Sequence, residues 1–181
     1  MQIIGITGRK GSGKDTFAEA MINEGWTPLK FAGPLKEMLK VLLRSAAHTD
    51  NHIDRLVDGD WKEVPLDCLS GKTPRHAMQT LGTEWREMIG ADLWTNILRQ
   101  HLMSEPTGHF VVTDVRFAHE VTMLKDLGAK IIRIEGHGEA NQLSAHASEQ
   151  EIDNLPVDAV VHNNGSIADL HRVALNLAKG I

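Results

Sequence analysis

Residues 8–14 read Gly-Arg-Lys-Gly-Ser-Gly-Lys, a G-x-x-x-x-G-K pattern between the apolar run 2–7 and a helical spacing of apolar residues over 15–23. A Gly-rich turn between a strand and a helix presents backbone N–H groups to an anion, and the helix N-terminus adds its positive dipole. The lysine of such a turn reaches the β- and γ-phosphates of a nucleotide. The sequence therefore predicts a phosphate-binding loop. Its one irregularity is Asp15 where Ser or Thr is expected, with Thr16 one place later.

Apolar runs that alternate with helical patterns predict parallel β-α-β units. Strands are expected at 2–7, 27–31, 110–114, 130–135 and 157–162. Helices are expected at 15–23, 33–43, 73–88, 91–103, 115–127 and 166–179, and loop or weak helix at 48–73. The predicted fold is α/β, a three-layer sandwich with a parallel sheet of about five strands. The long helical stretch at about 34–104 is expected to form a separate lobe.

The composition excludes several classes of protein. A net charge of −5 does not indicate general affinity for nucleic-acid polymers. Cys68 is the single cysteine, so no internal disulfide is possible and a reducing compartment is expected; we interpret Cys68 as a passive residue. Neither a membrane span nor a signal-peptide layout is present, which favours a cytoplasmic protein. Ten histidines show no metal-binding spacing, and a homodimer is compatible with the sequence.

Two charged residues follow the strand predicted at 110–114. A carboxylate at the end of such a strand, here Asp114, holds Mg²⁺ directly or through water in phosphate-transferring proteins, and the alternative is an ordinary helix N-cap. Arg116 can clamp a phosphate bidentately, and the alternative is a solvated surface arginine. Arg75 and Arg86 of the helical stretch are further cations for the same purpose.

Trp94 recurs at helical spacing with Leu98 and Leu102. That spacing favours a place in the core, and stacking against a flat ligand is the alternative.

Short motifs run in order across nearly the whole chain. They are Gly-Arg-Lys-Gly-Ser-Gly-Lys-Asp-Thr at 8–16, Ala-Gly-Pro-Leu-Lys at 32–36, Arg75 with Met78-Gln79 and Leu81-Gly82-Thr83, Trp94, Asp114-Val115-Arg116 with His119-Glu120, His146-Ala147-Ser148-Glu149, and Asn163-Asn164-Gly165-Ser166 with Leu170. In this order the chain resembles the deoxynucleoside monophosphate kinases of tailed bacteriophages, a branch of the P-loop kinases. Gly-Lys-Asp-Thr is the form that this family uses after the loop.

The resemblance implies one P-loop kinase domain over 1–181, with a helical monophosphate-binding insertion at about 34–104 and a lid at about 136–150. The implied ATP-binding residues are Gly8, Arg9, Gly11, Ser12, Gly13, Lys14, Asp15, Thr16, Asn163, Gly165 and Ser166, the last three in a turn beneath the adenine. Asp15, Thr16 and Asp114 would serve Mg²⁺, directly or through water. Lys14, Arg116 and Asp114 would be the catalytic residues.

The implied monophosphate site comprises Lys10, Leu35, Lys36, Arg75, Gln79, Trp94, Asp114, Arg116 and Glu120. The four cations would hold the acceptor phosphate, Trp94 would pack on the base or sugar, and Glu120 would bond the base edge. The lid contains no Arg or Lys, so substitutes are expected among Arg9, Lys10, Arg116, Arg133 and Arg172. His146 and Glu149 would either order the lid or contact the ligand.

The predicted function is transfer of the γ-phosphoryl of ATP to a deoxynucleoside monophosphate, which gives the diphosphate. A second hypothesis keeps the fold and changes the acceptor to dephospho-coenzyme A or phosphomevalonate. A third is a nucleotide-switched binding module of the GTPase type, which would carry a guanine-reading Asn-Lys-x-Asp motif that this chain lacks.

Overall fold

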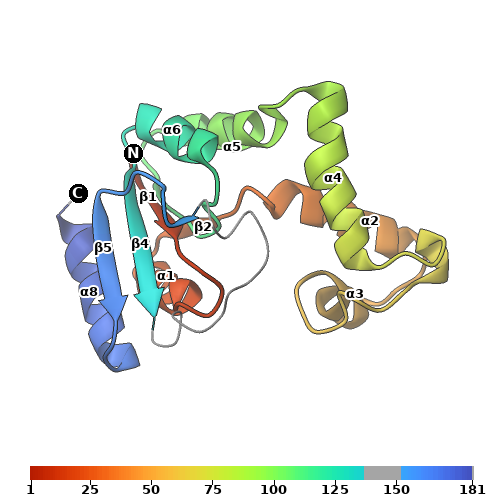
Figure 1. Ribbon diagram of the computed structural model, residues 1–181, viewed down its shortest axis with the longest axis horizontal. Coiled ribbons are helices and arrows are strands. Elements are labelled where there is room, and N and C mark those ends of the chain that lie inside the picture. The colour runs from red at the N-terminus through yellow and green to blue at the C-terminus, as the bar shows by residue number, and fades with distance from the viewer. Residues whose placement is uncertain (137–151, 181) are drawn as a thin grey trace. The chain divides into compact units, whose positions relative to one another are not determined.

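The computed structural model describes residues 1–136 and 152–180, and the chain divides into two compact units (Figure 1). One unit combines Met1–Phe31 with Leu98–Ile181 and contains the sheet, and the other, Ala32–Ile97, is helical. Within the described residues, no helix is long and apolar enough to cross a membrane.

The sheet has five strands in the order β2-β3-β1-β4-β5, and every neighbouring pair is parallel. The strands are β1 Gln2–Thr7, β2 Thr27–Leu29, β3 His109–Val112, β4 Lys130–Gly136 and β5 Ala159–Asn163. The predicted α/β fold with a parallel sheet of about five strands is therefore confirmed. Because all strands are parallel, their carboxyl ends lie at one edge of the sheet.

Helices cover both faces of the sheet, which gives three layers (Figure 1). Alternate residues of β1 point to opposite faces, Ile3 to one and Ile4 to the other. On the Ile4 face pack α1 (Lys14–Asn23) and α8 (Ile167–Lys179), and on the Ile3 face pack α6 (Ala118–Asp126) and the end of α5 (Leu93–Ser104). Each fully buried aliphatic or aromatic side chain in these layers contributes about 1.5–3 kcal/mol.

The strand order reverses direction at β1. From β1 the chain moves to the β2 edge, and from β3 it crosses over β1 to β4. In open α/β sheets the crevice at such a reversal, beyond the carboxyl ends of the strands, is where ligands bind. The segments that follow β1 and β3 are residues 8–13 and 113–117, so the fold brings together the two strand ends that the sequence singled out.

The helical unit contains α2 (Gly33–Ser45), α3 (Asp50–Val57), a short 3₁₀ turn (Asp67–Leu69), α4 (Pro74–Ile89) and the beginning of α5. Its core consists of Leu39, Leu43, Ile53, Leu56 and Val57. Loop or weak helix was expected at 48–73, and the structure has the helix α3 in the first part of this segment. The N-cap Thr49, whose Oγ1 accepts the His52 N–H, and the buried residues of α3 stabilise a helix that the polar composition obscured.

Fewer apolar side chains of α2 are buried than their helical spacing suggests. Leu35, Leu39 and Leu43 are buried, whereas Met38 and Leu42, which helical spacing places beside them, are exposed.

Neighbouring leucines of α2 provide a test of this packing. Leu43 is 0% exposed and Leu42 is 53% exposed. We expect Leu43→Ala to lower the free energy of unfolding by about 2–5 kcal/mol, because it removes buried methyl groups and leaves a cavity. The matched change Leu42→Ala is expected to cost less than about 0.5 kcal/mol. Urea unfolding followed by circular dichroism measures both, and equal losses in the two variants would contradict this packing.

Candidate active site

The loop predicted at residues 8–14 forms the turn between β1 and α1. Gly13 is the N-cap of α1, with φ of 100°, a left-handed conformation that favours glycine. The Phe17 N–H closes the first turn by donating to the Gly13 carbonyl at 2.9 Å. Because the first N–H groups of a helix have no partner within the helix, this turn presents donors and a positive dipole to an anion.

The loop packs closely against the ends of β4 and β5, and its glycines permit this approach. A Cβ on Gly8 would lie 2.3 Å from the carbonyl oxygen of Ile134 in β4, and one on Gly13 would lie 2.5 Å from Nδ2 of Asn163 in β5. Asn163 Nδ2 also donates to the Ser12 carbonyl at 3.0 Å. The Asn163 side chain, predicted to lie beneath the adenine, therefore supports the backbone of the phosphate-binding loop.

Lys14 folds back over the loop that precedes it. Its Nζ donates to the carbonyl oxygens of Gly8 and Arg9, each at 2.7 Å. The two carbonyl oxygens orient the ammonium group of Lys14. Because they are uncharged, they do not neutralise its positive charge. The Lys14 ammonium group is thereby held against the loop, and its contact with nucleotide phosphates stays a prediction.

Three buried hydroxyls lie at the loop and beside it. Thr7 ends β1, Ser12 is in the loop and Thr113 follows β3, and their Oγ atoms have no hydrogen-bond partner among the described residues. An unsatisfied buried hydroxyl costs about 1–3 kcal/mol, so in native proteins such groups usually meet water, an ion or a ligand. Their grouping at this edge of the sheet agrees with a site for oxygen-rich ligands.

Asp114 follows β3, where the sequence placed a Mg²⁺ carboxylate. Its Oδ1 accepts the Phe31 N–H at 2.8 Å, which ties the end of β3 to the segment after β2. Asp15 and Thr16 lie in the first turn of α1, and the Asp15 carboxylate, 88% exposed, is 3.9 Å from Lys30 Nζ.

The described residues contain no cluster of three or more His, Cys, Asp or Glu side chains that would hold a metal by itself. Mg²⁺ in nucleotide sites is typically held by one or two carboxylates together with substrate phosphates and water. The carboxylate and hydroxyl oxygens of Asp15, Thr16 and Asp114 fit that mode of binding.

Glu120 is buried and holds the turn that carries Arg116. Its Oε2 accepts the Arg116 N–H at 2.7 Å and the Phe117 N–H at 3.1 Å, where α6 begins. Burial raises the pKa of Glu120 to about 7, and the nearby Asp114 adds to the increase, while the two N–H donors and the Arg116 charge oppose it. The Arg116 side chain itself is exposed. Bonding to a base edge by Glu120 stays a prediction, because both of these hydrogen bonds are to its own backbone turn.

Arg9 and Arg133 converge on Asp153. Arg9 Nη2 pairs with the Asp153 carboxylate at 2.5 Å, and Arg133 Nη1 donates to the Asp153 carbonyl at 2.7 Å. Arg133 is also the partner of Thr7 in the β1–β4 register, which places it beside the start of the loop. Arg9 and Arg133, two of the five cations expected to substitute for lid arginines, therefore contact the same residue. Arg172, a third, pairs with the Asp169 carboxylate of its own helix α8. Lys10, another of them, is an exposed residue of the loop.

Ser166 is the N-cap of α8, directly after Gly165. Its Oγ accepts the Asp169 N–H at 3.2 Å and donates to the Asp169 carboxylate at 2.7 Å. Hydrogen bonds from Ser166 and then Arg172 lower the pKa of Asp169 to about 2. The turn predicted at the adenine is thus also the N-terminal cap of α8.

The remaining predicted acceptor-site residues belong to the helical unit. They are Leu35, Lys36, Arg75, Gln79 and Trp94. Leu35 is buried in α2, Gln79 is exposed on α4, Lys36 pairs with Asp58 at 2.8 Å, and Arg75 pairs with the Glu63 carboxylate.

Trp94 is 7% exposed and stacks on Trp85, with ring centroids 6.4 Å apart and planes inclined by 15°. Its burial agrees with the core interpretation. Its Nε1, however, has no hydrogen-bond partner among the described residues, so contact with a ligand stays a prediction. Arg86 donates from Nε to the Ala91 carbonyl at 3.2 Å, just beyond the end of α4.

Almost all of the lid predicted at about 136–150, with His146 and Glu149, lies outside the described residues; Gly136 ends β4.

Sequence reasoning missed three supporting residues. Asp153 holds Arg9, Trp85 stacks on Trp94, and Asp58 pairs with Lys36. Trp85 and Asp58 had no motif to mark them. A signal for Asp58 was present nonetheless, since aspartates recur every fourth residue at 50, 54 and 58.

A glycine-rich turn that follows a central strand, with its lysine at the start of a helix and a carboxylate after the neighbouring parallel strand, is the arrangement of a P-loop nucleotide-binding protein. The sequence model of the family described as deoxynucleotide monophosphate kinase matches residues 70–173. A protein of Acanthamoeba polyphaga mimivirus described as a deoxynucleotide monophosphate kinase is 33% identical over 187 residues, with 94% of this chain and 93% of that protein aligned. The chain belongs to the deoxynucleotide monophosphate kinase family.

Solved structures support the same fold. A dephospho-CoA kinase from Campylobacter jejuni aligns with a TM-score of 0.53 at 18% identity, over 99% of this chain and 96% of that one. A sugar kinase from Janibacter sp. HTCC2649 aligns with a TM-score of 0.51 at 15% identity, over 97% and 93%. At such identities the likeness concerns the fold alone.

The raised pKa of Glu120 predicts a pH dependence of stability. Because its pKa rises from 4.5 to about 7 on folding, the folded chain keeps a proton that the unfolded chain loses between these two values. The contribution of Glu120 to the free energy of unfolding is therefore fully present below about pH 4.5. It falls by roughly 3 kcal/mol as the pH rises through 7. We expect Glu120→Gln, which keeps an acceptor oxygen, to abolish this fall and to exceed the parent in stability at pH 8. Urea unfolding from pH 4.5 to 8 tests it, and parallel curves for the two proteins would contradict it.

Proposed function

We propose that this protein transfers the γ-phosphoryl group of ATP to a deoxynucleoside monophosphate and releases ADP and a deoxynucleoside diphosphate. The observation that carries the proposal is the loop 8–14, with the Lys14 ammonium group held against it, in a chain of the deoxynucleotide monophosphate kinase family. The carboxylate and arginine that follow β3, the strand next to β1, supply the further groups that transfer between two anions requires.

The ATP side of the site is formed by the loop and by the start of α8. The N–H groups of the loop and of the first turn of α1 would receive the phosphates, with Lys14 on the β- and γ-phosphates. The turn Asn163–Ser166 would lie at the adenine, and the hydrogen bond from Asn163 to Ser12 would hold this turn and the loop in one arrangement.

Mg²⁺ would be held by Asp15, Thr16 and Asp114, directly or through water. When bound, Mg²⁺ neutralises charge on the β- and γ-phosphates during transfer.

The residues that the family resemblance assigns to the acceptor are Lys10, Leu35, Lys36, Arg75, Gln79, Trp94, Asp114, Arg116 and Glu120. The phosphate of a nucleoside monophosphate is already ionised at neutral pH, so it attacks the γ-phosphorus without a general base. The protein's contribution is to orient the two substrates in line and to stabilise the spread of negative charge. No covalent enzyme intermediate is required.

An acceptor panel tests the proposal. ADP release from ATP is measured with the four deoxynucleoside monophosphates, their ribose forms, dephospho-coenzyme A and phosphomevalonate. We expect turnover with at least one deoxynucleoside monophosphate and its near abolition in Lys14→Ala, because the loop then loses its phosphate-directed charge. Turnover with none of the nucleoside monophosphates would refute the proposal, and turnover with dephospho-coenzyme A alone would establish a different acceptor.

A second prediction concerns Arg116. Arg116→Ala is expected to raise KM for the monophosphate and to lower kcat, by about tenfold or more in kcat/KM, since a charge-assisted contact to phosphate is worth about 1.5–3 kcal/mol. The control is Arg99→Ala in α5, which removes a half-buried arginine paired with Asp126 and is expected to leave the kinetics unchanged. Parent-like kinetics for Arg116→Ala would show that Arg116 does not contact the acceptor.

A further inference from the structure

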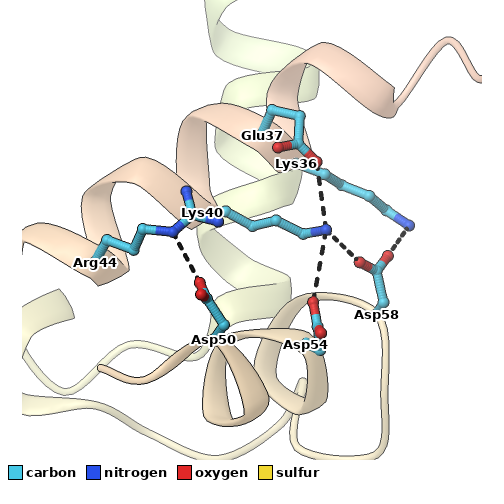
Figure 2. A network of polar contacts seen from close by, with 7 residues as sticks. All are labelled: Lys36, Glu37, Lys40, Arg44, Asp50, Asp54 and Asp58. Atoms are coloured by element: carbon cyan, nitrogen blue, oxygen red, sulfur yellow. Dashed lines mark hydrogen bonds and ion pairs between the residues drawn. The ribbon is translucent and has the colours of Figure 1, made fainter. Parts of the chain in front are cut away.

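A ladder of opposite charges joins α2 to α3 (Figure 2). The cations Lys36, Lys40 and Arg44 recur every fourth residue on α2, so they line one side of that helix. The aspartates 50, 54 and 58 recur at the same interval on α3 and at its C-cap. The two series run in opposite directions, so Arg44 meets Asp50 and Lys36 meets Asp58.

Lys36 and Lys40 pair with the same carboxylate, that of Asp58. Lys36 Nζ is 2.8 Å from Oδ1 of Asp58, and Lys40 Nζ is 3.0 Å from Oδ2 of the same residue. Lys40 is also 3.3 Å from the Glu37 carboxylate and 3.8 Å from that of Asp54. Asp58 thus bridges two ammonium groups, and in Figure 2 its carboxylate lies between them.

Lys40 is the more enclosed of the two lysines, with 17% of its side chain exposed against 23% for Lys36. Its pKa is raised, chiefly by the hydrogen bond to Asp58. Burial opposes ionisation of Asp58, but the hydrogen bonds from Lys36 and Lys40 outweigh it and the pKa of Asp58 is lowered. Lys40 and Asp58 are therefore both charged at neutral pH.

We propose that Lys40 is a positioning residue that makes Lys36 available to the acceptor phosphate. The inference rests on the proposed function, in which Lys36 is one of the cations on that phosphate. Asp58 holds the Lys36 side chain at the first turn of α2 but also competes with a phosphate for its charge. Because Lys40 occupies the second oxygen of Asp58, this carboxylate stays paired when Lys36 turns to a substrate.

Without Lys40, Lys36 would be the one lysine that contacts Asp58. Each time Lys36 bound a phosphate, the Asp58 carboxylate would then lose its lysine partner. Arg44 does not replace Lys40, since it lies eight residues from Lys36, about 12 Å along the helix, and pairs with Asp50. Lys40 and Arg44 both pair α2 with α3, but only Lys40 contacts the carboxylate that holds Lys36.

The experiment compares Lys40→Met with the matched variant Arg44→Met. We expect Lys40→Met to raise KM for the deoxynucleoside monophosphate about fivefold, within the range of partly exposed ion pairs, with KM for ATP unchanged. Arg44→Met removes one rung without touching Asp58 and is expected to retain the parent KM values. Adding Asp58→Asn to Lys40→Met removes the competing carboxylate, and we expect it to restore the monophosphate KM to within twofold of the parent.

Each outcome decides between the alternatives. Equal effects of Lys40→Met and Arg44→Met, a change in both KM values, or failure of Asp58→Asn to rescue would overturn the inference and leave the proposed function intact. If the parent transfers no phosphoryl group to any monophosphate, the proposed function fails. Calorimetric titration with the monophosphates then tests whether Lys40 affects their binding. Binding that weakens in Lys40→Met and recovers with Asp58→Asn supports the inference, whereas no binding by the parent overturns it.

Discussion

The structure depends on the close packing of one turn against the ends of two strands. Gly8 meets the backbone of β4 and Gly13 meets Asn163 of β5 at distances that leave no room for a Cβ. The turn is therefore shaped from outside as well as by its own glycines, and the direction of Lys14 follows from that shape. A phosphate-binding loop held in this way needs little reorganisation when an anion arrives, which keeps the cost of binding low.

Carboxylates likewise fix the positions of backbone and side-chain groups among the predicted site residues and their neighbours. Asp114 accepts the Phe31 N–H, Glu120 accepts two N–H groups at the start of α6, and Asp58 holds a lysine of α2. These groups hold backbone turns and cations in place at the positions where negatively charged substrates are proposed to bind. The negative charge around the site thus has a structural use, although it repels the substrates at long range.

Local patterns predicted much of this arrangement. The loop, the strands and the position of Asp114 were recognisable because a buried parallel strand and the turn after it are contiguous in the chain. The partners of Asn163 and Arg9 were not, since they lie 151 and 144 residues away. Residues 48–73 were left between loop and weak helix because the exposed polar residues of α3 outnumber the three residues that it buries. Glu120 illustrates an intermediate case: the family motif marked it as a site residue, but its burial, its hydrogen bonds to the start of α6 and its pKa depend on the folded core.

The hydrogen bond between Asn163 and Ser12 has a consequence for the order of folding. The loop lies between β1 and α1, yet its support comes from β4 and from residue 163, which is 151 residues away from Ser12. Contacts of such long sequence separation are slow to form. The phosphate-binding loop therefore reaches its final shape only after β4 and β5 have joined the sheet, although its own residues are contiguous in the chain.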